Sequence, residues 1–404
     1  MSVRLRPEIV AAAVLAFGFA AFPLFPAFIT LAAVTPPGVS LVPRRAAIAL
    51  LLVCVLAALA MVATLIRVRA PVPAGMRSIA IYIGGWLVAA LFGFDPATGL
   101  LFVVDGLFVA VFHWGIARFY RERGVATAVL AAFLASGAIV SLLGLAMVAI
   151  RRPAVLFAVE HGRATATFVV PGEFAGYLLF LIPLAAGTFI ASRRPALRLL
   201  AAVAALGGLV ALGATYSRAG WIGFAVGCAF CAFMLRRSVR SAVLIVGALV
   251  LGAAAIAVFN GHHNPSEYFT RVAIWIAGLR TIELFPLTGV GPGAFRLVYP
   301  ALRPPGAEPT AFHVHSYVLT SFAETGLVGM ATLVAMWWAF AQRFGRALGA
   351  AQGRRRILAL AVASGFIATW TQGALDFVQV TVLGCWIPFM ALAVGAAEHG
   401  VGEP

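Results

Sequence analysis

Apolar runs of about 20 residues recur along the whole chain of 404 residues, and this feature limits its fold more than any other. Only 10% of the residues are charged, whereas a soluble domain needs roughly a quarter to cover its surface. A helix of about 20 apolar residues crosses the hydrocarbon core of a bilayer while satisfying its own backbone hydrogen bonds. The sequence therefore predicts an all-α polytopic membrane protein.

Charged and turn residues divide the apolar runs into about 12 predicted transmembrane helices. The first run contains FPLFP, so it forms either one kinked span or a span followed by a re-entrant piece. The predicted spans lie near residues 9–34, 46–66, 77–93, 98–116, 125–150, 169–191, 197–214, 220–235, 241–259, 315–340, 357–376 and 378–397.

The basic residues are all arginines, 29 in number, and the formal net charge is +16. They fall in short clusters between apolar runs, which is typical of loops that orient spans in a bilayer, so no nucleic-acid partner is predicted. With the N-terminus inside, 19 of the 29 lie on the cytoplasmic side, and we therefore place both termini in the cytoplasm. Ten external arginines suggest that some of them hold an anionic group.

One long external loop, residues 260–314, separates the ninth and tenth predicted spans. Within it, Val272, Ile276 and Leu279 follow helical spacing in EYFTRVAIWIAGLRTIEL, which predicts a helix lying at the membrane surface. Neither an internal repeat nor a low-complexity segment is evident. We therefore expect residues 1–404 to form a single integral membrane domain with this loop on its outer face.

The stretch FHVHSYVLTSFAETGLVGM places His313 and His315 where this loop re-enters the membrane. An imidazole at the boundary between water and lipid can take a proton from a hydroxyl near neutral pH, which makes His315 the candidate general base. The alternative is an interfacial histidine bonded to a loop carbonyl. HxH can also bind zinc, but no third ligand stands at a useful spacing, so we predict no metal and no cofactor.

Three further motifs carry groups that can hold an anion. Arg218, in TYSRAGW, either clamps a lipid diphosphate or contacts lipid headgroups. Arg271 and Arg280 stand nine residues apart on the surface helix, so they face different sides and at most one reaches a shared site directly. Gly291, in LTGVGPGAF, exposes backbone amides to an anion or, as we favour, belongs to a tight turn.

Carboxylates inside apolar runs are functional candidates by default. Glu324 lies about two and a half turns into the tenth span, and Glu173 lies in the sixth. Asp105 and Asp376 also lie in apolar runs, and for these two we predict a structural partner within the bundle.

Taken together, four motifs resemble the bacterial O-antigen ligase and polymerase superfamily. The motifs are SRAG at 217–220, RxxxW at 271–275, FPLTGVGPGAF at 285–295 and HSYVLTSFAETGLVG at 315–329. Their order and spacing, with a looser similarity in RATATFVVPGEFAGYLL at 163–179, carry the resemblance over roughly residues 160–330.

The resemblance implies a GT-C-like glycosyltransferase that takes a glycan from undecaprenyl diphosphate on the periplasmic face of the inner membrane. Metal-independent, inverting transfer is implied with it. The family's essential histidine falls on His315, and its two arginines fall on Arg218 and Arg271. Further substrate contacts are expected from Arg163, Arg280, Arg296, His313, Glu324 and Gly291.

The leading hypothesis is an O-antigen ligase, whose acceptor is the lipid A-core oligosaccharide. A polymerase or a protein O-oligosaccharyltransferase of the same superfamily would use the same donor. A lipid-glycan flippase or transporter would also suit twelve spans with acids inside the membrane. The most polar segment lies at one face of the membrane, however, whereas a transporter would place its substrate site at mid-membrane.

Overall fold

The computed structural model describes residues 6–24, 44–122, 124–152, 158, 160–168, 170–236, 238–259, 266–376, 378 and 385–401. Within these ranges all regular secondary structure is helical, which confirms the predicted all-α class. The helices are α1 (Pro7–Leu24), α3 (Arg44–Arg67), α4 (Met76–Leu91), α5 (Pro96–Phe119), α6 (Val125–Ile150), α8 (Pro171–Ala191), α9 (Pro195–Ala214), α10 (Arg218–Arg236), α11 (Val239–Phe259), α12 (Ser266–Leu284), α13 (Phe295–Leu302), α14 (Tyr317–Ala350), α15 (Gly353–Leu375) and α17 (Ile387–His399).

Each of the twelve predicted spans overlaps one of these helices. Among the described residues, α5, α6, α8, α9, α10, α14 and α15 are long and apolar enough to cross a bilayer, and α1, α3, α4, α11 and α17 contain shorter apolar helices. The chain is therefore a multi-pass membrane protein. The choice between a kinked first span and a re-entrant piece falls on residues 25–43, outside the described part. The start of the predicted loop, 260–265, and residues 379–384 of the last span also lie outside it.

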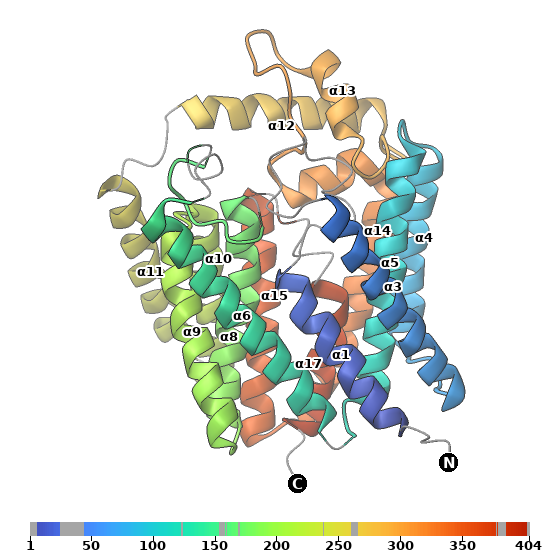
Figure 1. Ribbon diagram of the computed structural model, residues 1–404. Coiled ribbons are helices and arrows are strands. Elements are labelled where there is room, and N and C mark those ends of the chain that lie inside the picture. The colour runs from blue at the N-terminus through green and yellow to red at the C-terminus, as the bar shows by residue number, and fades with distance from the viewer. Residues whose placement is uncertain are drawn as a thin grey trace.

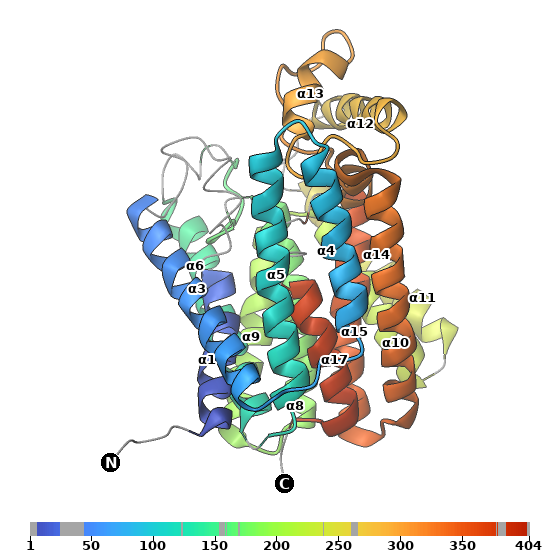
Figure 2. The same ribbon diagram turned by 90° about the vertical axis from the view of Figure 1, so that its right-hand side faces the viewer.

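The long helices stand side by side and alternate in direction, while α12 runs across one end of the bundle (Figures 1 and 2). We call this the α12 end. Helix α1 begins and α17 finishes at the opposite end, which we call the terminal end (Figure 1). The predicted surface helix is thus present, and it lies over the end of the bundle remote from both termini.

Arginines gather at the terminal end, where the chain turns between helices. Arg67 finishes α3, Arg118 lies in the last turn of α5, and Arg193 lies between α8 and α9. Arg354 and its two arginine neighbours stand in the first turn of α15. These positions belong to the set predicted to face the cytoplasm, and they lie at one end of the bundle.

Helix α12 packs on the bundle through a small apolar cluster of its own. Ile274 and Ala277 are buried against the loop before α14 and against α13. A Cβ atom added to Gly278 would lie 2.5 Å from the Val314 side chain, so glycine lets the helix approach this loop closely. The face predicted from periodicity, with Val272 and Leu279, is exposed instead, at 51% and 56%. Helix α12 therefore has two apolar sides, one against the protein and one outward.

Small residues bring α10 directly onto α15. A Cβ added to Gly223 would lie 2.5 Å from the carbonyl oxygen of Ala368, and one added to Gly227 would lie 2.9 Å from that of Ser364. Close approach through small residues is the usual way in which transmembrane helices associate, because lipid supplies no hydrophobic drive between them. This packing brings the first turn of α10 toward the last turns of α15 at the α12 end.

Two cross-helix hydrogen bonds join α8, α14 and α15 at the same end. Gln372 in α15 donates through Nε2 to the carbonyl oxygen of Gly172 in α8, at 2.7 Å. The amide of Tyr317, the first residue of α14, donates to the carbonyl oxygen of Asp376 at 3.2 Å. The ends of three helices are thus fixed relative to one another, directly beneath α12.

Candidate active site

A cavity of about 310 Å³ opens at the α12 end, where these helix ends meet the segment before α8, the loop before α14 and one side of α12. Its polar lining combines two arginines, two histidines and four carboxylates. The lining residues are Glu160, Arg163, Val170, Pro171, Gly172, Glu173, Thr270, Arg271, Glu308, His313, His315 and Asp376. Four of the residues predicted from sequence, Arg163, Arg271, His313 and His315, are thus brought together.

His315 is held in a strained position at the start of α14. Its φ of 52° lies in the left-handed region, which costs a non-glycine residue about 1–2 kcal/mol. Its carbonyl oxygen accepts a hydrogen bond from Nε1 of Trp275 on α12, at 3.4 Å. The next residue, Ser316, is the N-cap of α14, and its hydroxyl accepts from the amide of Leu319 at 3.4 Å. Contacts on both sides therefore fix the backbone from which the imidazole projects.

Asp376 stands between the histidine and the arginine. Its Oδ1 atom lies 3.7 Å from Nδ1 of His315 and 3.7 Å from Nη2 of Arg271. Nδ1 of His315 is buried and forms no hydrogen bond with any described residue. A separation of 3.7 Å is longer than a hydrogen bond, but catalytic hydrogen bonds often shorten only when substrate is present. The carboxylate is thus placed to orient the imidazole.

Arg271 also closes the end of α15. Its Nη1 donates to the carbonyl oxygen of Leu375, the last residue of that helix, at 3.3 Å. A guanidinium at this point satisfies a carbonyl that the helix leaves unpaired and complements the helix dipole. The side chain remains 33% exposed, so part of the guanidinium still faces the cavity.

His313 lies beside His315, with ring centroids 4.4 Å apart and planes at 61°. Burial, followed by the neighbouring His315 and Arg271, holds the pKa of His313 well below its usual value, against the opposing effect of Asp376. His313 is therefore neutral at neutral pH and a weaker base than an ordinary histidine. Both imidazoles line the cavity, so position alone does not separate their roles.

Arg163 and Arg218 lie on either side of the connection between α9 and α10. Nε of Arg163 donates to the carbonyl oxygen of Thr215, the C-cap of α9, at 2.9 Å. Arg218 is the first residue of α10, partly buried, and does not line the cavity. The hydroxyl of Ser217 accepts from the amide of Gly220 at 3.1 Å, which makes it the cap of that helix.

The remaining predicted arginines bind other parts of the protein. Arg280 donates through Nη1 to the carbonyl oxygen of Leu302, at 2.9 Å, and so ties α12 to the end of α13. Arg296 forms an ion pair with Asp95 across 2.8 Å, near the start of α5. Neither arginine lines the cavity.

Gly291 and Glu324 meet at a break in α14, away from the cavity. Gly326 has φ 60° and ψ −163°, which interrupts the helix and frees carbonyl oxygens from their usual partners. The amide of Gly291 donates to one of them, that of Glu324, at 2.9 Å. A Cβ added to Gly289 would lie 2.3 Å from the Glu324 carbonyl carbon. This loop thus contains the turn that the sequence favoured, seated against the break.

Of the four carboxylates of the cavity, Glu173 was named as a functional candidate from the sequence, whereas Glu160, Glu308 and Asp376 were not. Glu173 is 1% exposed, in the first turn of α8, within the motif at 163–179. Asp376 was expected to find a structural partner, and Arg271 provides one, but its place beside His315 could not be read from the sequence. Asp105, by contrast, forms no hydrogen bond or ion pair with the described residues, so the partner predicted for it is missing there.

The described residues contain no group of three or more histidine, cysteine, aspartate or glutamate side chains that could hold a metal ion. Metal-independent transfer stays a prediction, which a chelator experiment can test.

A family model described as O-antigen ligase matches residues 201–334. These residues are thus similar to the O-antigen ligase family. The match covers about a third of the chain and includes Arg218, Arg271 and His315, while Arg163, Glu173 and Asp376 lie outside it. The resemblance seen in the sequence is thereby confirmed over this region, and it supports a ligase or polymerase activity of this family. No curated protein matches the chain.

Proposed function

We propose that the protein is a lipopolysaccharide O-antigen ligase, which transfers a glycan from undecaprenyl diphosphate to the lipid A-core oligosaccharide. The observation that carries the proposal is the cluster of His315, Asp376 and Arg271 in one cavity, next to a region of the O-antigen ligase family. A ligase needs a base for the acceptor hydroxyl and a cation for the departing diphosphate, and this cluster offers both.

In the proposed reaction, His315 takes the proton from an acceptor hydroxyl as its oxygen attacks the anomeric carbon. The new glycosidic bond forms while the bond from that carbon to the diphosphate oxygen breaks, and its electron pair leaves with undecaprenyl diphosphate. Asp376 stabilises the imidazolium that develops. This carboxylate would act on a charge present in the transition state and absent in the ground state, so it favours the rate over binding.

The charges that line the cavity place the sugars and the diphosphate on different sides of it. Apart from Asp376, which faces Arg271 and His315, the carboxylates are Glu160, Glu173 and Glu308, which repel a diphosphate but accept hydrogen bonds from sugar hydroxyls. We therefore place the sugars at these three carboxylates, and the diphosphate toward Arg271, Arg163 and the adjacent start of α10 at Arg218. Planar guanidinium groups grip two phosphate oxygens at once, and fixed cations at this point stabilise the leaving group.

We further propose that residues 1–404 form one integral domain of the bacterial inner membrane, with the α12 end in the periplasm. The arginines at the terminal end support this orientation, because positive loops stay in the cytoplasm. The membrane itself is then a partner, and α12 would rest its exposed apolar side on the outer surface of the bilayer.

The activity can be tested with purified protein and undecaprenyl diphosphate-linked glycan as the donor. Three acceptors are offered in separate reactions: lipid A-core, a second lipid-linked glycan, and an acceptor protein. Product on lipid A-core alone supports the ligase. Longer lipid-linked glycan would indicate a polymerase, and glycosylated protein an oligosaccharyltransferase. A flippase forms no product in detergent with any of them.

A further inference from the structure

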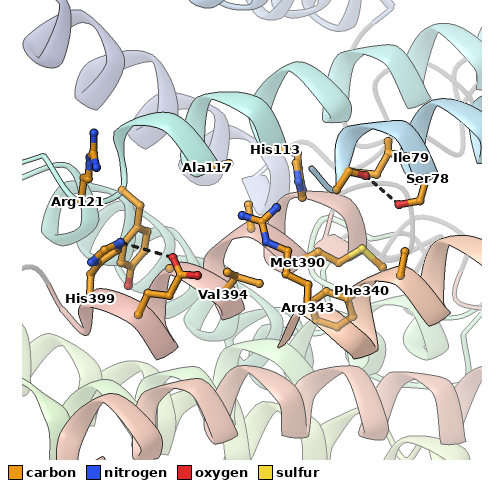
Figure 3. Close-up of a pocket in the computed structure, with 16 residues that line it drawn as sticks. Ser78, Ile79, His113, Ala117, Arg121, Phe340, Arg343, Met390, Val394 and His399 are labelled. Atoms are coloured by element: carbon orange, nitrogen blue, oxygen red, sulfur yellow. Dashed lines mark hydrogen bonds and ion pairs between the residues drawn. The ribbon is translucent and has the colours of Figure 1, made fainter. Parts of the chain in front are cut away.

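A second, smaller cavity of about 60 Å³ lies at the terminal end, among the start of α4, the end of α5, the second half of α14, and α17 (Figure 3). It shares no residue with the cavity beneath α12. Its lining includes Arg121, Arg343, His113, His399 and one carboxylate, Glu398. Two guanidinium groups thus face this cavity, against one carboxylate.

No described residue neutralises either arginine. Arg343 and Arg121 form no hydrogen bond or ion pair with any residue that the structure describes, and Arg343 is partly buried. Glu398 is directed to His399 instead, with its Oε2 atom 3.6 Å from Nε2, as the dashed line in Figure 3 shows. A partly buried guanidinium without a partner is costly, and an anion in the cavity would remove that cost.

The histidine in the wall is oriented by the backbone. Nδ1 of His113 lies 2.8 Å from the carbonyl oxygen of Ile387, and a carbonyl only accepts, so Nδ1 carries the proton. Nε2 is therefore left on the side of Gly75 and Arg343. In Figure 3 the His113 ring and the Arg343 guanidinium point toward each other from α5 and α14.

Gly75 keeps this space open. Its φ of −70° and ψ of −19° are accessible to any residue, so the backbone does not require glycine here. A Cβ atom added to it would lie 3.5 Å from Nε2 of His113 and 3.7 Å from Nη1 of Arg343. A larger side chain would extend between these two groups. The missing side chain is thus what leaves room for a small polar group beside the guanidinium.

The remaining walls are apolar. Ile79, Phe340, Met390 and Val394 contribute them, and Figure 3 shows these side chains around the guanidinium of Arg343. A single water molecule needs about 10–15 Å³ of such cavity volume, so a cavity of 60 Å³ holds a group of several oxygen atoms. A tetrahedral phosphate presents such a group, and arginine binds it through two parallel hydrogen bonds.

We infer that this cavity is a phosphate-binding site, filled by the phosphate of a membrane lipid headgroup or by a soluble phosphate. Arg343 supplies the central contact, Arg121 completes the positive rim, and the apolar walls suit a headgroup whose chains lie along the bundle. The site lies at the end of the molecule opposite the proposed transfer reaction, so it serves to anchor or regulate the protein and not to perform that transfer.

Binding can be measured without any enzyme assay, on detergent-purified protein by native mass spectrometry and thermal unfolding. The probes are phosphatidylglycerol, inorganic phosphate, and diacylglycerol, which lacks a phosphate. Arg343→Gln removes the central contact, and Gly75→Met fills the cavity without changing its charge. Arg346→Gln is the matched control, because Arg346 is exposed on the same helix and does not line the cavity.

We expect both cavity variants to bind phosphatidylglycerol about tenfold more weakly or worse, and the control to bind like the wild type. Protection by phosphatidylglycerol alone assigns the site to a lipid, and equal protection by inorganic phosphate assigns it to a soluble ion. The inference is overturned if diacylglycerol binds as well as phosphatidylglycerol, if Arg343→Gln and Gly75→Met bind like the wild type, or if Arg346→Gln loses as much as they do.

Discussion

Replacing Asp376 by Asn tests whether this carboxylate stabilises the charge that develops on His315. Two unit charges at about 4 Å interact by about 1 kcal/mol in water and about 4 kcal/mol at an effective dielectric constant of 20. Here the atoms are 3.7 Å apart, and the side chains of His315 and Asp376 are 32% and 13% exposed. Solvent screening therefore places the interaction near the lower part of that range, at about 1–2 kcal/mol.

A loss of about 1–2 kcal/mol in the transition state lowers kcat by roughly 5-fold to 30-fold. Because the interaction is absent while the imidazole is neutral, the KM for the acceptor should change little. The backbone amide and carbonyl of Asp376, which bond to Gln372 and Tyr317, are unaffected by the substitution. The folded state should therefore survive, which a thermal unfolding curve checks.

Glu308→Gln provides the matched control, since Glu308 lines the same cavity, is exposed, and forms no ion pair with His315. Transfer rates are measured with purified protein and saturating donor. If Asp376→Asn and Glu308→Gln have equal kcat values, the carboxylate does not act on the imidazole. A change confined to KM would equally refute the reasoning, because it would assign Asp376 to substrate binding.

Three other predictions address the base, the leaving group and the orientation. His315→Gln should abolish transfer by folded protein whereas His313→Ala retains measurable activity, and a chelator should alter neither; the reverse order would make His313 the base. Arg271→Lys should impair transfer, because an ammonium keeps the charge but loses the planar fork, and a fully active variant would reduce this arginine to a structural cap of α15. A reporter fused near Pro305 should report the periplasm and one near Gly353 the cytoplasm; matching signals from both would refute the orientation.

Helices were predictable because each carries its own signal. An apolar run of about 20 residues predicts a membrane span regardless of which helices that span packs against, and each of the twelve predicted spans overlaps a helix. The surface helix was found by its periodicity, but the side it turns to the protein was not, since Ile274 and Ala277 are no more apolar than Val272 and Ile276. Which side is buried depends on the loop around Val314, which only the tertiary structure places.

The sequence predicted those residues of the candidate site that are neighbours in the chain. It missed those that only the packing of separate helices brings together. His313 and His315 stand in one short motif, so their neighbourhood follows from the sequence. Asp376 reaches His315 from the end of another helix, 61 residues later in the chain, through the packing of α14 on α15. The amide of Gly291 donates to the carbonyl oxygen of Glu324 at the break in α14, and no periodicity in the sequence reveals that break.

The lipopolysaccharide of a strain that lacks this protein tests the central claim most directly. A ligase defect leaves lipid A-core without O-antigen while the lipid-linked polymer accumulates, and we predict this pattern, with full chains restored by the wild-type protein but not by His315→Gln. Cores that carry single O-antigen units would show that polymerisation has failed instead. That result would contradict the proposed ligase and assign the cavity beneath α12 to a polymerase.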